Sequence, residues 1–451
     1  MADFGELLDE RIDAILERHG VPGAAIGIRH AGTEILRGFG HTSVANPLPV
    51  DPDTIFQVGS ISKTLLGFII GKLLDEAEVG LDDPVAPLLD PESGIDPRIT
   101  LRHTITHTSG IDAQNMIADA PNLLAGRAND SIQASLRHFA RRPLLFEPGS
   151  DFSYSGPGIM VAAAVVERVT GRAYADVLRD TVLVPAGMEI TCTTADEAIL
   201  RRVAAPHGRT PDGEPELLVD RGWQRHWQLP GWDVPGGGVL STARELMRYA
   251  RFVTSDAAPS RLFEILADRG PRGEHIGLAW HLDEIEGHPS MSHDGLTIGY
   301  ASRLVLVPAL DLAYTVLTNS LEGGGVVAEI DRLIKTEVLG HIPGRTLSPV
   351  PAELAEALAG TYDCGFYGTM TVAPGRHSGE LRLIANAAAT EPGQYVIDLE
   401  SADRVLQCAP DALMIIDDDG SPVSDVPFVQ DRYGRITAIR WHGRIAHRTG
   451  A

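Results

Sequence analysis

The apolar residues of this chain recur at two spacings, and each spacing predicts a different kind of element. Near the N-terminus they recur every three or four residues and stop near Gly20, which is the spacing of an amphipathic helix. These positions are Leu7, Leu8, Ile12, Ile15 and Leu16. The next stretch, GAAIGIRHAGTEILRGFG, has β-rich runs on both sides of residues 31–33. It predicts a β-hairpin.

The rest of the first 343 residues continues this alternation of helix and strand patterns. A long and mostly helical stretch runs from about Ser62 to Tyr249, and MSHDGLTIGYASRLVLVPALDLAYTVLTNS again has the pattern of strands. Residues 328–339 predict a closing helix. This order favours an α+β domain at 1–343, with an antiparallel sheet completed by both ends of the segment, flanked by helices, and with an inserted helical subdomain.

The last hundred residues have a different pattern. Proline and small residues at 344–358 predict a linker with a short helix. Beyond it, short strand-like runs such as ELRLIA, QYVIDL and ALMIID alternate with turn residues over 359–451. Such a series predicts a small antiparallel β-barrel or sandwich.

Composition and charge narrow the classes of function. The chain has 451 residues, 43% of them hydrophobic, and a formal net charge of -23. Such a charge repels phosphate backbones and anionic headgroups, so we expect neither nucleic acid nor membrane as a partner. The first twenty residues carry charges and lack the apolar run of a secretory signal, which favours a cytoplasmic protein. Cys192, Cys364 and Cys408 are far apart, and we expect neither a disulfide framework nor a zinc site from them.

The stretch QVGSISKTLLGFIIGKLL places Ser60 and Lys63 where a glycine turn gives way to a helix. A serine hydroxyl must lose its proton to a base as it attacks, and residues three apart share one face of a helix. Unpaired N–H groups at a helix start also suit a developing oxyanion. The alternative is that Ser60 only caps the helix and Lys63 is solvated.

Several spaced motifs decide between these alternatives. The stretch around Ser60, ITLRHTITHTSGI, FEPGSDFSYSGPGIM, PGGGVLSTARELMRYA and SHDGLTIGYASRLVLVP follow one another in order. Together they resemble the serine β-lactamase and penicillin-binding-protein superfamily. Within it they resemble the branch of class C β-lactamases, D-aminopeptidases, carboxylesterases and penicillin-binding-protein-type thioesterases.

The resemblance implies a role for each matching residue. Ser60 is the nucleophile and Lys63 its base, and Tyr154 in YSG is a second base or the acid for the leaving group. His293 opens the third motif, His-x-Gly, and supports the proton network of Tyr154. The resemblance also implies an oxyanion hole made by the backbone N–H groups of Ser60 and Leu296.

Two departures from the superfamily pattern bear on the substrate. Gly156 stands where the superfamily usually has an asparagine that holds an acyl side-chain amide, and His293 stands where β-lactamases have a lysine. Both changes point away from β-lactam substrates. The resemblance implies that substrate is bound at three positions, which are Gly156, Asp294 and Gly295. Trp232 is a further candidate for the pocket wall, and equally a buried structural tryptophan.

Other patterns in the sequence give weaker evidence of function. His103 and His107 have helical i,i+4 spacing, but zinc needs three or four converging ligands, so we expect no metal and no cofactor. Four arginines in the last strands form a solvated face, or one of them reaches over the cleft to a substrate carboxylate. They are Arg435, Arg440, Arg444 and Arg448.

The resemblance implies acyl transfer through Ser60 but leaves the acceptor open. The first hypothesis is a stand-alone penicillin-binding-protein-type thioesterase with a C-terminal lipocalin-like barrel. It would take a peptidyl chain ending in a D-residue from a carrier protein and cyclise it. The second is a D-aminopeptidase, D-amino-acid amidase or carboxylesterase. The third is a catalytically silent receptor on the same fold.

Overall fold

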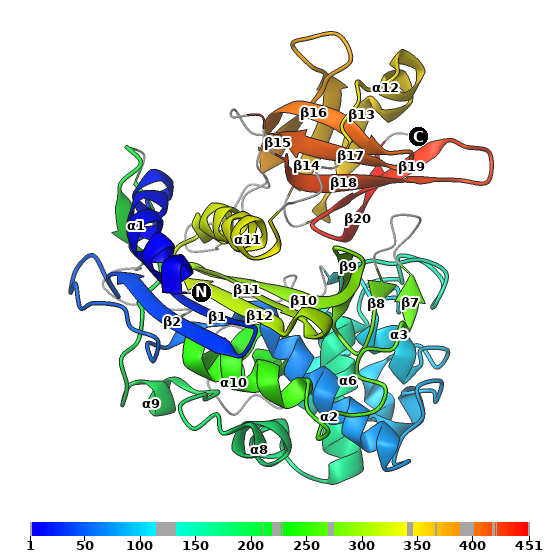
Figure 1. The fold of residues 1–451 in the computed structure, drawn as a ribbon. Coiled ribbons are helices and arrows are strands. Elements are labelled where there is room, and N and C mark those ends of the chain that lie inside the picture. The colour runs from blue at the N-terminus through cyan, green and yellow to red at the C-terminus, as the bar shows by residue number, and fades with distance from the viewer. Residues whose placement is uncertain are drawn as a thin grey trace. The chain divides into compact units, whose positions relative to one another are not determined.

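The computed structural model describes residues 2–113, 132–210, 212–218, 227, 229–268, 275–340, 346–365, 368–387, 401–416, 420 and 422–449. These residues divide into two compact units, which are described separately (Figure 1). The first unit holds the described residues up to 106 together with 132–141 and 156–340. The second holds 107–113, 142–155 and the described residues from 346 onward.

An eight-stranded antiparallel sheet is the centre of the first unit. Its spatial order is β2 (Thr33–Gly40), β1 (Gly23–His30), β12 (Leu312–Thr318), β11 (Tyr300–Val307), β10 (His288–Thr297), β9 (His281–Ile285), β8 (His275–Ile276) and β7 (Ala267–Asp268). Strand β1 pairs with β12 so that Ala24 lies opposite Thr318. The two ends of the segment therefore complete one sheet, and the predicted α+β domain is confirmed.

Helices pack on both faces of this sheet. On one face lie α1 (Ala2–His19) and α11 (Gly323–Leu339), whose apolar side chains form one core with those of the sheet (Figure 1). On the other lies α10 (Ala243–Val253), so close to β1 that a Cβ on Gly27 would come within 2.6 Å of the Met247 side chain. The sheet is therefore covered on both faces, which fixes the position of its strands.

The stretch between the two halves of the sheet is mainly helical, as the sequence predicted. Its further helices are α2 (Ser62–Asp75), α3 (Leu101–Ile105), α5 (Ile132–Phe139), α6 (Gly156–Thr170), α7 (Tyr174–Leu178), α8 (Val184–Ala186) and α9 (Ala195–Ala198). Two short strand pairs join them: β3 (Phe56–Gln57) with β6 (Leu240–Ser241), and β4 (His207–Arg209) with β5 (Pro215–Leu217). Residues 157–166 of α6 are all buried. A helix that is apolar on every side is an internal helix, and α6 is the centre of this helical part.

The second unit contains a closed barrel of eight antiparallel strands. They are β13 (Gly360–Asp363), β14 (Gly368–Pro374), β15 (Leu381–Ala387), β16 (Ala402–Ala409), β17 (Ala412–Ile416), β18 (Pro422–Gln430), β19 (Ile436–Trp441) and β20 (Arg444–Arg448). Strand β13 closes the barrel against β20, with Tyr362 opposite Arg448. The short helix α12 (Ala352–Leu358) precedes it, and the Tyr362 hydroxyl donates to Leu358 O at 2.7 Å. The predicted antiparallel barrel is confirmed.

Two stretches from the middle of the chain also belong to this second unit. Residues 107–113 and 142–155 bond to each other, as in the hydrogen bonds from Leu145 N to Gly110 O at 2.8 Å and from Ser153 N to His107 O at 3.0 Å. The sequence prediction divided the chain in order, into 1–343, a linker at 344–358 and 359–451. It did not anticipate this grouping, because only contacts distant in the sequence create it.

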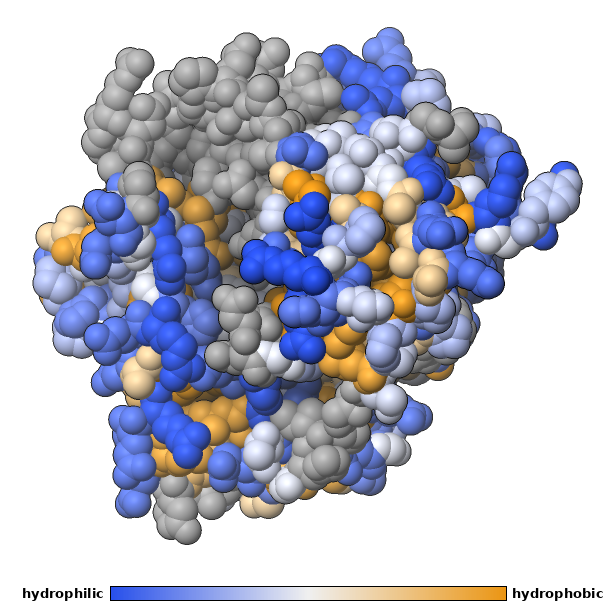
Figure 2. All heavy atoms as spheres, turned by 90° about the horizontal axis from the view of Figure 1, so that it is seen from above, coloured by the Kyte–Doolittle hydropathy of each residue, from blue (hydrophilic) through white to orange (hydrophobic). Residues whose placement is uncertain are grey.

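The exposed surface of the described residues carries both hydrophilic and apolar side chains (Figure 2). Figure 2 shows one face on which hydrophilic residues predominate and apolar residues occur in small groups. In the part of the chain that the structure describes, no helix has both the length and the apolarity needed to cross a bilayer. Large hydrophobic side chains that remain exposed are scattered along the chain, which is normal for globular surfaces. They are Val44, Leu48, Val184, Ile199, Leu200, Ile265, Leu296, Val423 and Tyr433.

The three cysteines are free thiols. Burial raises the pKa of Cys192 to about 12, and it also raises the pKa of Cys364 to about 12. A thiol with so high a pKa stays protonated at neutral pH and is a poor nucleophile. These two side chains are therefore inert, and the chemistry of the molecule has to be sought elsewhere.

Candidate active site

Ser60 lies in the tight turn that leads into helix α2, where the sequence predicted the start of a helix. It is the central residue of a 3₁₀ turn, Gly59–Ile61, and α2 follows at Ser62. Gly59 has a φ of 53°, in the left-handed region that favours glycine. The Ser62 hydroxyl donates to Gly59 O at 2.7 Å and accepts from Val239 N at 3.2 Å. These bonds fix the turn that presents Ser60.

Lys63 is hydrogen-bonded to Ser60. Its Nζ donates to Ser60 Oγ at 2.8 Å and also to the backbone oxygen of Gly236. The lysine is buried, with 3% of its surface exposed. A base must lie within about 2.6 to 3.2 Å of the hydroxyl that it deprotonates. The structure therefore brings this predicted pair together in a geometry that allows proton transfer.

Asp233 is a group near Lys63 that the sequence analysis missed. It ends the 3₁₀ turn Gly231–Asp233, and Gly236 connects it to Lys63 because a Cβ on Gly236 would clash with the Asp233 carboxylate. Burial raises the pKa of Asp233 to about 7, while the charge of Lys63 opposes this rise. The only signal in the sequence is an acidic residue just before the run VPGGG.

The backbone of β10 approaches the Ser60 turn closely. A Cβ added to Gly59 would lie 2.7 Å from Leu296 N and 3.0 Å from the carbonyl carbon of Gly295. A Cβ added to Gly295 would clash with Val58 O, to which the Ser302 hydroxyl donates at 2.9 Å. Leu296 N therefore lies beside the residue that precedes Ser60. The two predicted oxyanion donors are brought to the same place.

His293 lies on the face of β10 that is turned toward this site. It is two residues before Gly295, and side chains two apart in a strand share a face. The imidazole is buried, lies 4.8 Å from the ring of His281, and has Nδ1 2.7 Å from Asp294 O. A carbonyl oxygen only accepts, so Nδ1 carries the proton and donates. In the neutral ring, Nε2 is then the atom that can accept a proton.

The side chain of Asp294 lies on the opposite face of β10. Its carboxylate accepts from Arg303 at 2.7 Å, and Arg303 also lies 2.9 Å from Asp331 in α11. That face carries α11, whereas Gly295 faces the Ser60 turn. Asp294 was predicted to bind substrate, and the structure does not bring its side chain together with Ser60. The alternation of side chains along a strand is the reason.

Trp232 and Gly156 are the remaining residues that the sequence analysis placed at the substrate pocket. Trp232 is buried, and its ring meets that of Phe139 edge to face with 5.8 Å between centroids. Gly156 is the first residue of α6. The expectation that these two residues bind substrate stays a prediction.

Tyr154 belongs to the second unit. Its ring centroid lies 4.3 Å from that of His107 and 5.0 Å from the guanidinium carbon of Arg444, and its N–H donates to Gly443 O at 2.9 Å. The position of Tyr154 relative to Ser60 spans the two units and stays a prediction of the sequence.

His103 and His107, the two histidines at helical spacing, each accept a hydrogen bond from the backbone. His103 Nδ1 accepts from Thr100 N at 3.2 Å within the cap of α3, and His107 Nδ1 accepts from Ser155 N at 3.2 Å. Burial lowers the pKa of His103. Within the described residues, no three or more histidine, cysteine, aspartate or glutamate side chains converge where they could hold a metal ion.

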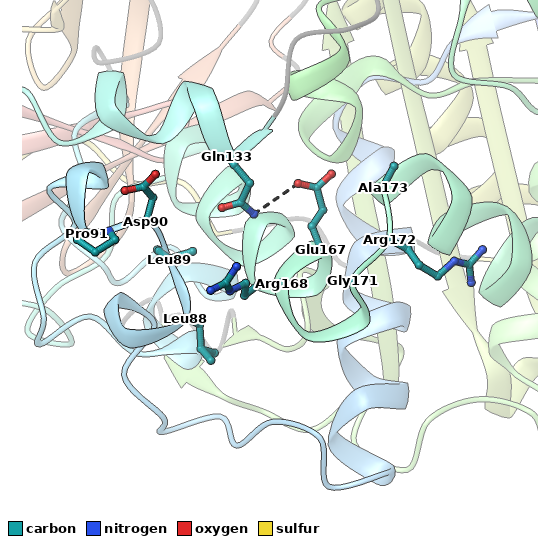
Figure 3. Close-up of a pocket in the computed structure, with 10 residues that line it drawn as sticks. All are labelled: Leu88, Leu89, Asp90, Pro91, Gln133, Glu167, Arg168, Gly171, Arg172 and Ala173. Carbon is teal, nitrogen blue, oxygen red and sulfur yellow. Dashed lines mark hydrogen bonds between the residues drawn. The ribbon is translucent and has the colours of Figure 1, made fainter.

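A separate cavity of about 600 Å³ lies in the first unit, and neither Ser60 nor Lys63 lines it (Figure 3). Gln133 and Glu167 point toward each other at its wall, with a hydrogen bond of 3.4 Å. Burial raises the pKa of Glu167. The lining includes Asp90, Arg168 and Arg172, a mixture of charges that indicates no particular ligand.

Comparison with known proteins identifies the family. The beta-lactamase family model matches residues 8–338. Penicillin-binding protein 4 of Amycolatopsis lactamdurans is 29% identical over 389 residues, which are 78% of this chain and 96% of that protein. The D-aminopeptidase of Gluconobacter oxydans is 26% identical over 435 residues, which are 90% of this chain and 77% of that protein.

Solved structures show the same fold along nearly the whole chain. The crystal structure of SurE matches with a TM-score of 0.68 at 22% identity, over 99% of both chains. SurE has also been solved with D-Leu, and that structure matches with a TM-score of 0.67. The chain therefore belongs to the beta-lactamase family, whose members are serine hydrolases acting on amides and esters.

Proposed function

We propose that this chain is a penicillin-binding-protein-type thioesterase. It accepts a peptidyl chain with a C-terminal D-residue from a carrier-protein thioester onto Ser60, and releases the peptide by head-to-tail macrocyclisation or by hydrolysis. The observation that carries this proposal is the hydrogen bond of 2.8 Å between Lys63 Nζ and Ser60 Oγ, in a turn that Leu296 N approaches closely. A nucleophile, its base and an oxyanion donor are the parts that acyl transfer requires.

In the first half-reaction Ser60 takes the acyl group. The Lys63 amine accepts the hydroxyl proton while Ser60 Oγ attacks the thioester carbon, and the negative charge collects on the carbonyl oxygen beside the N–H groups of Ser60 and Leu296. The C–S bond then breaks, and the carrier thiol leaves with a proton. An ester of Ser60 remains.

In the second half-reaction the acyl group leaves Ser60. The peptide's own N-terminal amine attacks the ester carbon, an amide bond forms, and the serine oxygen recovers a proton from the attacking amine through the site's bases. If water attacks instead, the product is the linear acid. Pocket shape decides between amine and water, because both use the same catalytic groups.

Two observations support a D-residue peptide as the substrate, and a third points away from β-lactams. The SurE structures cover 99% of this chain, barrel included, and one of them holds D-Leu. A curated relative over 90% of the chain is a D-aminopeptidase. Gly156 and His293 depart from the residues with which the superfamily holds β-lactams.

The similarity to D-aminopeptidase favours a second candidate, hydrolysis of D-amino-acid amides or short D-peptides. The same residues would act, with water as the acceptor. The silent receptor is the third candidate, and the intact Lys63–Ser60 hydrogen bond disfavours it.

One experiment separates the three. The protein is incubated with a peptidyl thioester ending in a D-residue, its L-ended counterpart, a D-alanyl amide and a chromogenic cephalosporin, and intact mass and products are followed. A mass increase that Ser60→Ala abolishes, with cyclic product from the D-ended thioester only, supports the proposal. Hydrolysis of the amide without cyclic product favours the second candidate. No adduct from any substrate would contradict both.

A further inference from the structure

The last hairpin of the barrel contacts Tyr154 and the three residues before it. Strands β19 and β20 pair with Trp441 opposite Arg444, joined by a two-residue turn. Both turn residues have positive φ, 46° at His442 and 73° at Gly443. Two such residues make a tight turn whose twist matches that of the paired strands, so the direction of its carbonyl groups is fixed.

This turn and the strand after it bond directly to the Tyr154 segment. Tyr154 N donates to Gly443 O at 2.9 Å, and Ile445 N donates to Ser153 Oγ at 3.2 Å. Ser153 is buried. The hairpin therefore holds the backbone of the tyrosine and the side chain of the residue before it.

Two arginines of the same hairpin add to this contact. The Arg440 guanidinium forms an ion pair with Asp151 and donates from Nε to Phe152 O at 3.3 Å. The pair is largely enclosed, with 13% of the Arg440 side chain and 25% of the Asp151 side chain exposed. Arg444 lies over the Tyr154 ring, with its guanidinium carbon 5.0 Å from the centroid. Cation–π contacts of this kind orient aromatic rings.

The arginines of the last strands thus differ from one another. Arg435 pairs with Asp431 of its own loop and is 76% exposed, and Arg448 donates to Ala357 O at 2.9 Å. Among the described residues, Arg440 and Arg444 are the arginines of this group that contact residues 151–154. A solvated face, which was one prediction for all four, describes Arg435 alone.

We propose that the β19–β20 hairpin of the barrel is part of the acid–base machinery, with Arg440 and Arg444 as positioning residues that hold Tyr154. This inference rests on the proposed function only in giving Tyr154 its role as the acid for the leaving group. Without the hairpin, Tyr154 loses the acceptor of its backbone N–H and the guanidinium that lies over its ring, and keeps the contact with the His107 ring.

The test uses two substrates with the same acyl group and different leaving groups. A D-alanyl amide needs its leaving nitrogen protonated, whereas a D-alanyl p-nitrophenyl ester does not. General acid catalysis contributes about 10²–10⁴-fold, so we expect Arg440→Met to lower kcat for the amide by about 10-fold to 100-fold and to change the ester rate about threefold at most. Arg440→Lys, which keeps the charge, should recover part of the loss.

Controls separate positioning from general damage. Arg435→Met is the matched control, because Arg435 lies in the same region but pairs with Asp431 of its own loop. It should leave the amide rate and the ester rate unchanged. Asp151→Asn removes the other half of the ion pair and should reproduce the Arg440→Met selectivity. In a Tyr154→Phe background, Arg440→Met should have no further effect on the amide. Equal losses on amide and ester would overturn the proposal.

Hydrogen exchange gives a readout without any substrate. The Tyr154 N–H is bonded to Gly443 O, so its peptide should exchange faster in Arg440→Met and Arg444→Met than in Arg435→Met. Unchanged exchange in the first two variants would also overturn the inference. If the chain hydrolyses D-amides but accepts no carrier-bound thioester, the proposed thioesterase function is wrong. The amide and ester comparison and the hydrogen-exchange measurement would still test the role of the hairpin.

Discussion

Ser60 is held by contacts with nearby residues in the sequence, whereas Tyr154 is held by contacts with distant ones. Ser60 is bonded to Lys63, three residues further along the same helix start, whereas the Tyr154 segment is bonded to residues 48 and 292 positions away. The first arrangement is local and needs little beyond a correctly formed helix. The second requires contacts both with His107 and with strand β20 of the barrel. We therefore expect damage near Ser60 to affect every substrate, and damage near Tyr154 to affect substrates selectively.

The largest expected effect is that of Lys63→Ala. Without the amine, Ser60 loses the base to which it is hydrogen-bonded, and acylation by amide and ester should both fall by about 10³–10⁴-fold. The measurement is the burst of p-nitrophenol from a D-alanyl ester, with the melting temperature as a check on folding. Lys72→Ala is the matched control, because Lys72 belongs to the same helix and lies over the Phe68 ring. A normal burst in Lys63→Ala would remove this lysine from the mechanism.

Gly59→Ala should have the next largest effect. A Cβ there would lie 2.7 Å from Leu296 N, and the residue would also be held at a φ of 53°. Displacing an oxyanion donor costs about 10²–10³-fold in kcat, again for amide and ester alike. Gly324→Ala is the control, since nothing lies within 4 Å of a Cβ at that position. If both variants keep the wild-type kcat, Leu296 N is not an oxyanion donor.

Tyr154→Phe should reveal the difference between the two regions. We expect kcat for the D-alanyl amide to fall by about 10²-fold and that for the p-nitrophenyl ester to stay within about threefold, because only the amide needs an acid. The ratio of the two rates, measured on one enzyme preparation, is independent of the active fraction. Tyr433→Phe, at a tyrosine that is 69% exposed, is the control. A loss of the same size on both substrates would contradict the assigned role.

Asp233→Asn should have the smallest effect, and one that depends on pH. The pKa of Asp233 is raised to about 7 by burial, from an ordinary value of about 3.9, so between these values the folded state binds more protons than the unfolded state. Stability from this group is therefore present at about pH 4 and is lost as pH rises to about 7. Asparagine does not titrate.

The measurement is the melting temperature of Asp233→Asn relative to wild type across that window. We expect the difference to move in favour of the variant by on the order of 5 °C between about pH 4 and pH 8. Asp294→Asn serves as the control, because that carboxylate is exposed and paired with Arg303. A difference that stays constant with pH would show that Asp233 titrates normally.

The sequence determined the elements and the local half of the site. Periodicity alone predicts the helix that starts beside Ser60, and helical geometry then places Lys63 next to it, since residues three apart share a face. The order of helices and strands, and the series of short strands after residue 359, follow from the same alternation of apolar spacings. These features depend on local patterns, which a sequence displays directly, whereas the closure of the barrel depends on the pairing of β13 with β20.

The tertiary structure decided the rest. Four features of the structure depend on residues that are far apart in the chain. They are the approach of Leu296 N to Gly59, the orientation of Asp294 away from the site, the raised pKa of buried Asp233, and the contact of the β19–β20 hairpin with Tyr154. Strand register and burial create these contacts, and neither is visible in the composition of one segment. The physical reason is that a side chain's partners depend on where its strand or turn is packed, which only the complete fold specifies.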